Sequence, residues 1–299
     1  MKFMLKFLQI IFLASGFLSC KAQNEPEIPR AADGNTLLWE VSGNGLSSPS
    51  YIYGTFHLMC KDQLHLSGNL LTAIKRSKEV YFELDLDDLS NTLGAIFMMN
   101  MKNSTSWKDL YNEADFNTVT SYFRDSLKMP LSMVEKMKPS FAESMLYPKF
   151  LNCKNMSGVE QEILAVAKKD NKEIKGLETI AFQMSVFDSI PYQEQAQSLL
   201  KTIDSLQQSK IFFDSLVQIY NSQNLSAMEA AFSTPEYGMA DNLDILLNKR
   251  NKNWVTQFKN IFASQPVLVA VGAGHLVGEQ GILSLLKKEG YTVTPLLNK

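Results

Sequence analysis

Histidine and cysteine are scarce in this chain of 299 residues, which has three of each. So few cysteines exclude a disulfide-rich scaffold. An excess of basic charge is also missing, because 29 lysines and arginines stand against 31 aspartates and glutamates and leave a formal net charge of −2. This balance argues against nucleic acid or an anionic membrane surface as a partner. What the chain does have is 45% hydrophobic residues, which predict a globular protein with a sizeable core.

The first residues contain a short apolar run, FLQIIFLASGFLS at 7–19, which is too short for a stable transmembrane helix. It follows Lys2 and Lys6, and a basic start before such a run is typical of a bacterial export signal. Cys20 comes directly after this run, as in a lipoprotein signal that is cleaved before the cysteine and lipidated on it. An ordinary secretory signal that contains this cysteine by chance is the alternative.

Cleavage before Cys20 divides the chain into three parts. Residues 1–19 are the signal peptide, and residues 20–36, polar with two prolines, are a flexible tether that carries the lipid. Residues 37–299 form the folded domain. We therefore expect an exported lipoprotein, anchored to a membrane of the bacterial cell envelope and located in the periplasm or at the outer membrane.

The two ends of the domain repeat one pattern of strand, glycine loop, helix and strand. Near the N-terminus, TLLWEVSG at 36–43 forms a hairpin with YIYGTF at 51–56, and EVYFELD at 79–85 follows a helical pattern. Near the C-terminus, PVLVAVG at 266–272 and YTVTPLL at 291–297 flank another helical pattern. We expect these strands to form one mixed central sheet in an α/β (α+β) fold.

Residues 87–265, between the two ends, carry mostly helical patterns and predict a large helical insertion or cap. Asp87 or Asp88 is an ordinary N-cap for its first helix. One interruption is EIKGLE at 173–178, which reads as a further strand and follows a helix that begins at Gly158. One domain with a helical lid is the simplest arrangement.

Two of the three histidines follow a strand that ends in Gly-x-x-His. His57 comes three residues after Gly54, and His275 comes three residues after Gly272. A glycine at a strand end allows a sharp turn and the close approach of a ligand, and α/β folds place their sites at such strand ends. Imidazole is the commonest metal ligand in proteins and a general base near neutral pH. Either histidine alone is open to a purely structural interpretation, but the duplication favours a shared site.

Glu83 lies on the polar face of the strand at 79–85. We expect this strand to lie beside the strand that carries His57, with the carboxylate near the same end of the sheet. A carboxylate with two histidines is a plausible ligand set for a divalent metal ion. We therefore expect His57, Glu83 and His275 to face one cavity, whereas His65, in a loop before a helix, reads as a surface residue.

Six short segments resemble, in their order and spacing, the TraB/GumN family, which includes the Tiki metalloproteases. The resemblance covers about residues 37–297. The segments are YIYGTFHL at 51–58, VYFELD at 80–85, SGVEQEI at 157–163, KGLET at 175–179, RNKNW at 250–254 and VGAGHLVGEQGILSLLKKEGY at 271–291.

The resemblance implies a Tiki-like α/β fold and a metal-dependent hydrolytic site at His57, Glu83 and His275. Arg250 and Asn251 match the Arg-Asn pair of the family. On spacing alone, both would be surface residues of a charged helix.

Two acidic residues, Glu160 and Glu178, match acidic positions in the Gly-x-Asp/Glu and Leu-Glu-Thr segments of the family. Without the resemblance they read as solvent-facing acids at a helix start and a strand end. This chain has Glu160 where the family often has aspartate. Gly54 and Gly272 would support the site through the turns that they allow.

Two functions follow. The first is a metal-dependent hydrolase, a peptidase in our interpretation, with a peptide or small molecule as substrate. In it the histidines bind a divalent ion, and Glu83 completes the ligand shell or accepts a proton from the attacking water. Arg250 would stabilise negative charge on the cleaved carbonyl. The second is a non-catalytic envelope protein that sequesters a peptide, haem or another small ligand in the same cleft. The sequence does not choose among Mn, Fe, Co and Zn.

Cys60 and Cys153 remain after the signal, in a compartment that permits disulfides. Cys60 follows His57 by three residues, and Cys153 shortly precedes Gly158 and Glu160. Convergence of these segments at the site would bring the two thiols together, so we predict a disulfide between them. Two unrelated buried thiols are the alternative.

Overall fold

The computed structural model describes residues 27–88, 98–234 and 242–299. The predicted signal peptide, Cys20 and the first part of the tether lie outside the described residues, as does most of the helix expected after Asp88. No helix within the described ranges is both long and apolar enough to cross a membrane.

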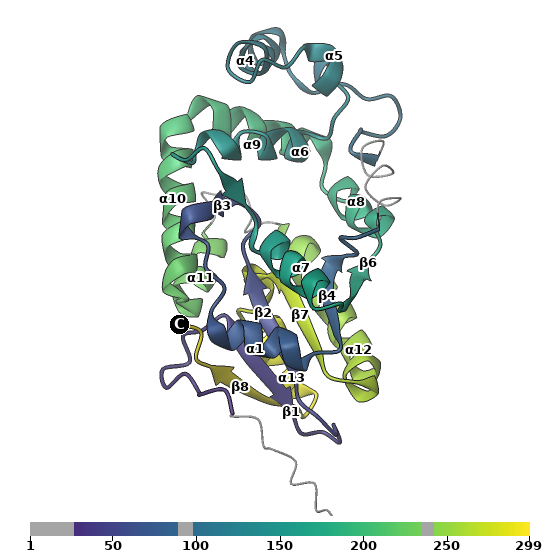
Figure 1. Ribbon diagram of the computed structural model, residues 1–299. Helices are drawn as coiled ribbons and strands as arrows, with labels where there is room; N and C mark the ends of the chain where they lie inside the picture. The colour runs from purple at the N-terminus through teal and green to yellow at the C-terminus, as the bar shows by residue number, and fades with distance from the viewer. Residues whose placement is uncertain (1–26, 89–97, 235–241) are drawn as a thin grey trace, which may run out of the picture.

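A mixed six-stranded sheet with the order β6-β4-β7-β2-β1-β8 forms the centre of the protein (Figure 1). Strands β6, β4, β7 and β2 run parallel, whereas β1 is antiparallel to both β2 and β8. The expected hairpin is present and the first and last strands share one sheet, so the predicted fold class is confirmed. The bounds are β1 Leu38–Ser42, β2 Ser50–Thr55, β4 Glu79–Leu84, β6 Glu173–Glu178, β7 Val267–Gly272 and β8 Thr292–Leu296.

The central strand β7 is an almost continuous apolar run that is buried on both faces, as is typical of a parallel strand covered by helices. Its side chains alternate between two cores. Leu268 and Ala270 pack on one face of the sheet, where α1 (Gly68–Arg76) and α7 (Val159–Lys169) cover it. Val269 and its neighbours pack on the other face, under α12 (Lys249–Ser264) and α13 (Ile282–Lys288). Figure 1 shows the resulting three layers.

A helical cap lies beyond the carboxyl ends of the parallel strands (Figure 1). Its core is continuous with that of one sheet face, since Trp107 and Phe123 belong to the same cluster as Phe82. Polar caps begin several of its helices, as where the Asn112 side chain accepts a hydrogen bond from the Asp115 amide. The helices are α3 Trp107–Leu110, α4 Glu113–Asp125, α5 Leu131–Val134, α6 Pro139–Ser144, α8 Ile180–Asp188, α9 Tyr192–Asp204, α10 Leu206–Ser222 and α11 Leu225–Phe232.

Short elements connect these layers. A π-helix, η5 (Asp244–Asn248), precedes α12, and the 3-10 turns are η1 (Lys61–Gln63), η2 (Tyr147–Lys149) and η6 (Ala273–His275). Strands β3 (Met59–Cys60) and β5 (Met156–Ser157) form a small antiparallel sheet. Helix α13 is followed by Gly290, whose φ of 89° is the left-handed conformation that favours glycine.

The strand order corrects one expectation. Strand β7 lies between β4 and β2, so the strand of Glu83 does not lie beside the strand that precedes His57. Local patterns fix the strands, but the order depends on how the crossover helices pack against the sheet. The strand expected at 173–178 is present as β6, which adds part of the middle segment to the edge of the sheet.

Candidate active site

The two Gly-x-x-His segments lie against each other at one end of the sheet. Strands β2 and β7 are parallel neighbours with Thr55 opposite Gly272, so both chains leave the sheet at the same edge. A Cβ atom at Gly54 would lie 2.8 Å from Leu276 Cδ1, closer than packed atoms allow. Glycine at position 54 therefore permits the contact between the two loops.

The side chains of His57, Glu83 and His275 gather around Gly272. A Cβ atom at Gly272 would lie 3.3 Å from Glu83 Oε1, 3.6 Å from His57 Nε2 and 3.7 Å from His275 Cδ2. Glu83 Oε1 lies 3.7 Å from His275 Nε2 and accepts a hydrogen bond of 3.0 Å from the Gly272 amide. Three residues that are distant in the sequence therefore surround the space that the missing side chain leaves.

The imidazole of His275 is buried and held from both sides. Its Nδ1 lies 2.6 Å from Asn251 Oδ1, its Nε2 lies 3.2 Å from Arg250 Nη1, and its ring lies on that of Trp254, with centroids 4.4 Å apart. Burial, aided by Arg250 and only partly opposed by Glu83, lowers the pKa of His275 to about 3. The ring is therefore neutral at physiological pH.

The partners of Asn251 define the tautomer of His275. Asn251 Nδ2 donates to the Gln280 carbonyl at 2.9 Å, which leaves Oδ1 facing the ring. Since this oxygen only accepts, His275 carries its proton on Nδ1 and presents the lone pair of Nε2 toward Glu83 and Arg250. Asn251 thus positions His275 for a role that uses Nε2.

His57 has a comparable support from a carboxylate. Its Nδ1 lies 2.6 Å from Glu160 Oε1, and its Nε2 faces Gly272. Desolvation opposes a charge on the ring, yet the Glu160 carboxylate outweighs it and raises the pKa of His57 to about 9. The side chain is nonetheless 72% exposed, so solvent screens part of both effects.

Glu160 is held by the loop that it supports. Its Oε1 also accepts a 2.6 Å hydrogen bond from Thr55, while its Oε2 is buried without a partner among the described residues. A Cβ atom at Gly158 would lie 2.4 Å from the His57 carbonyl, so only glycine lets α7 begin this close to His57. Spacing alone did not assign Glu160 to the site, but its carboxylate contacts His57 in the structure.

Arg250 contacts several of the buried residues of the site. Its Nε and Nη2 donate to the Glu178 carboxylate at 2.8 to 3.1 Å, and Nη2 also donates to Glu83 Oε2 at 2.6 Å. Its Nη1 donates to the Leu246 carbonyl at 2.9 Å and lies against His275 Nε2. All five N–H groups of the guanidinium therefore have partners, so donation to a substrate requires one of these bonds to open.

The pKa values of the two carboxylates that hold Arg250 shift in opposite directions. Burial opposes the charge of Glu83, but His275, Arg250, His57 and the Gly272 amide together lower its pKa to about 2. For Glu178, burial outweighs Arg250 and raises the pKa.

Three residues that support the site were not predicted from the sequence. Gln183 on α8 donates to Glu83 Oε2 at 3.2 Å, and nothing in its local pattern indicates this contact. Trp254 lies one helical turn after Arg250 and under its guanidinium, so helical spacing offered a signal for it. Thr55, which binds Glu160, directly follows Gly54. His65 is exposed, as expected.

A disulfide joins the loop after His57 to the segment before Gly158. Cys60 and Cys153 are bonded, with Cα atoms 5.8 Å apart, so the predicted bridge is present. Strands β3 and β5 pair next to it. The bridge and this small sheet tie the His57 loop to the segment that delivers Glu160.

The model of the TraB/PrgY/gumN family matches residues 37–295, which include every site residue described above. The chain belongs to this family. It is similar to the Metalloprotease TIKI1 of Danio rerio, with 22% identity over 88% of this chain and 63% of that protein. It is also similar to the Metalloprotease TIKI homolog of Nematostella vectensis, with 21% identity over 87% of this chain and 66% of that protein.

This TraB/PrgY/gumN protein thus spans about two thirds of the length of the relatives that it matches. No solved structure matches it. The names of the relatives support a hydrolase at the level of the family and suggest a metal ion, whose identity they leave open.

The donor set fits a metal ion in its chemistry, although within the described ranges no three His, Cys, Asp or Glu side chains lie close enough to hold one. Both histidines use Nδ1 for a hydrogen-bonded support, as metal-binding histidines usually do. The space beside Gly272 lies between Nε2 of His57 and Oε1 of Glu83. Metal binding at His57, Glu83 and His275 stays a prediction.

Proposed function

We propose that this protein is a metal-dependent hydrolase that cleaves peptides in the bacterial cell envelope. His57, Glu83 and His275 would hold the divalent ion. The observation that carries the proposal is the arrangement of the two imidazoles: Nδ1 of each is held by Glu160 or Asn251, and both rings border the space beside Gly272.

The charge of the site supports the same proposal. Three carboxylates, those of Glu83, Glu160 and Glu178, stand against the single guanidinium of Arg250. An ion bound to His57 Nε2 would take the place of the proton that the raised pKa of this ring retains, and the site would then carry an excess of two negative charges. A divalent cation would balance this excess, and burial of unbalanced charge is costly.

Hydrolysis of a peptide adds water across the C–N bond. The water oxygen bonds to the carbonyl carbon, the C–N bond breaks, and the proton that the water loses goes to the leaving amine. When bound, the ion would lower the pKa of a coordinated water and polarise the carbonyl. Glu83, ionised at neutral pH, either completes the ligand shell or carries the proton.

Metal binding at His275 would change the hydrogen bonds of Arg250. His275 Nε2 has one lone pair, so it cannot accept a hydrogen bond from Arg250 Nη1 and bind an ion at the same time. Occupation of Nε2 would therefore release one N–H of Arg250. This N–H is the donor that we assign to the developing negative charge on the substrate carbonyl.

A library of synthetic peptides, incubated with the purified protein and Mn, Fe, Co or Zn, tests the proposal by mass spectrometry. We expect cleavage that a chelator abolishes and that is lost in His57→Ala and His275→Ala. His65→Ala, which changes the remaining and exposed histidine, should cleave like the wild type. Cleavage that survives the chelator, or that is equal in all variants, contradicts the assignment.

Sequestration of a peptide, haem or another small ligand is the second candidate, and the state of Arg250 favours it. All its donors are occupied, and the pKa of Glu83 makes this carboxylate a weak base. A protein that binds the ion and a ligand but cleaves nothing in the library would have this function.

Anchoring through Cys20 places either activity in the envelope. The mature protein should partition with membranes, and Cys20→Ser should release it into the soluble fraction or retain its signal. Intact-mass analysis gives the first residue and the modification. An unmodified N-terminus at another residue would refute lipidation.

A further inference from the structure

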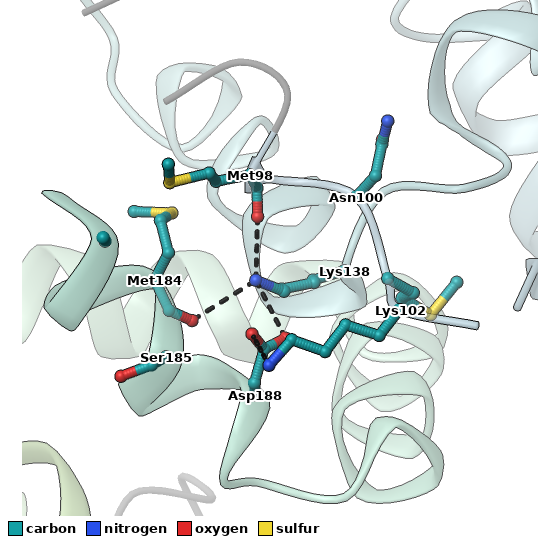
Figure 2. A pocket seen from close by; sticks show the side chains of 9 residues that line it. Met98, Asn100, Lys102, Lys138, Met184, Ser185 and Asp188 are labelled. Carbon is teal, nitrogen blue, oxygen red and sulfur yellow. Dashed lines mark hydrogen bonds and ion pairs between the residues drawn. The ribbon is translucent and has the colours of Figure 1, made fainter. Parts of the chain in front are cut away.

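A cavity outside the candidate active site, the α8 cavity, lies between α8 and the segment 98–102 (Figure 2). Its volume is about 330 Å³, which is within the range of ligand sites. Neither the proposed chemistry nor the family resemblance uses it.

The charged groups of the α8 cavity are already paired. Lys138, whose side chain is 2% exposed, donates from Nζ to the carbonyls of Met98 at 2.8 Å and Met184 at 3.3 Å. The same ammonium lies 2.9 Å from Asp188 Oδ1, and Lys102 Nζ lies 3.0 Å from Oδ2 of the same carboxylate. Figure 2 shows these contacts around Lys138 and Asp188. A charged ligand would lose its hydration here without gaining a free partner.

The part of the α8 cavity wall without charged groups is mainly apolar. Met98, Met101, Ala181 and Met184 line it beside the polar Asn100 and Ser185, and three of the four apolar side chains are thioethers. Methionine is flexible and polarisable, so such a wall adapts to apolar side chains of different shapes. This part of the wall therefore suits an apolar side chain of the size of methionine, leucine or isoleucine.

Helix α8 separates this cavity from the candidate active site. Successive residues of a helix are turned by about 100°, so Ala181, Met184 and Asp188 share the face toward the cavity. Gln183 points away from this face and donates to Glu83 Oε2. Phe182 lies between the two faces, and its side chain is 42% exposed. One helix thus borders both sites, with an exposed aromatic ring between them.

We propose that the α8 cavity binds an apolar side chain of the peptide whose cleaved bond lies beside Glu83, with the peptide backbone passing over Phe182. This inference rests on the proposed peptidase function. A helix is about 10 Å wide and an extended peptide advances about 3.3 Å per residue. The bound side chain is therefore about two to four residues from the cleaved bond.

Cleavage specificity tests the inference directly. A synthetic library with every position randomised is cleaved by the wild type, by Ala181→Trp and by Gln208→Trp. Ala181 is exposed and lines the cavity, so tryptophan there fills the cavity without entering the core, whereas Gln208 is an exposed residue of α10 that does not line it. We expect a preference of about tenfold or more for methionine, leucine or isoleucine at one position two to four residues from the cleaved bond.

The preference should disappear in Ala181→Trp and persist in Gln208→Trp. A wild type without any preference in this window, or an Ala181→Trp variant that keeps it, overturns the inference. If the wild type cleaves no peptide, the proposed function fails. Whether the α8 cavity binds a peptide side chain is then tested by a measurement that needs no turnover.

That measurement is photo-crosslinking of the mature protein with peptides that carry a photoreactive methionine analogue. The crosslinks should map to residues 98–102 or 181–188 and be lost in Ala181→Trp but not in Gln208→Trp. Crosslinks elsewhere, or none, would overturn the binding site whatever the activity of the protein.

Discussion

Asn251 Oδ1 accepts a hydrogen bond from His275 Nδ1 at 2.6 Å, and the same amide donates to the Gln280 carbonyl. This pair fixes the proton of a buried imidazole on the nitrogen that points away from Glu83. The adjacent residue on α12, Arg250, lies against the other ring nitrogen. The Arg-Asn pair thus determines both the tautomer of His275 and what its Nε2 contacts.

Loss of the Asn251 side chain should weaken metal binding without removing a ligand. In Asn251→Ala, His275 loses the acceptor for Nδ1–H, and we expect the affinity for the ion to fall by about 10- to 100-fold. Calorimetric titration measures the affinity, and nitrogen NMR of labelled His275 reports the tautomer. Asn117→Ala, at an exposed position of α4, should change neither. Unchanged affinity together with an unchanged tautomer in Asn251→Ala would contradict the positioning role.

The space beside Gly272 should be essential although the backbone there tolerates a side chain. In Gly272→Ala, the new methyl group would lie 3.3 to 3.7 Å from the three site side chains, distances that the fold can absorb. The φ of Gly272 is −49°, which alanine adopts without strain. We expect a normal melting temperature and a loss of peptide cleavage of about 100-fold or more.

Gly68→Ala is the matched control, because a Cβ atom there would have no neighbour within 4 Å. It should match the wild type in stability and cleavage. A fully active Gly272→Ala variant would show that the reacting groups lie elsewhere.

The strands and the two glycine-histidine loops were predictable because their signals are local. A strand that ends in glycine is visible in six or seven letters, and two such strands in one sheet bring His57 and His275 to one edge. The adjacency of β4 and β7 was not predictable, since it depends on which crossover helix packs where.

Of the supporting contacts in the site, some likewise have a local signal in the sequence and others have none. Trp254 follows Arg250 by one helical turn, so its position under the guanidinium has a periodic signal. Gln183 reaches Glu83 only because the cap folds back over the sheet, a contact across 100 residues that no local pattern encodes. The roles of Arg250 and Asn251 came from family resemblance, because charge and spacing alone placed them on the surface.

Removal of Arg250 should cost the fold more than any exposed ion pair. Its side chain is 8% exposed and that of Glu178 is 1% exposed, so Arg250→Gln leaves a buried carboxylate without its cation. We expect the free energy of unfolding to fall by about 3 to 5 kcal/mol, measured by urea denaturation. Arg124→Gln, which breaks an exposed pair with Asp125, should leave the curve in place. Equal urea denaturation curves for the two variants would contradict a stabilising role of Arg250 in the buried part of the site.

The disulfide should stabilise the fold through the long loop that it closes. Cys60 and Cys153 are 93 residues apart, so the double replacement by serine should lower the free energy of unfolding by about 4 to 5 kcal/mol in the chain-entropy model. Reductant should shift the wild type toward the variant and leave the variant unchanged. If reductant shifts both equally, the stabilisation comes from elsewhere.

Metal content, measured by elemental analysis of the mature protein, shows whether His57 and His275 hold a divalent ion. The four proteins are the wild type, His57→Ala, His275→Ala and His65→Ala, each incubated with Mn, Fe, Co and Zn and then dialysed. We expect about one divalent ion per chain in the wild type and in His65→Ala, and a content lower by about tenfold or more in the other two. A wild type that retains no ion, or four proteins with the same metal content, would contradict this expectation.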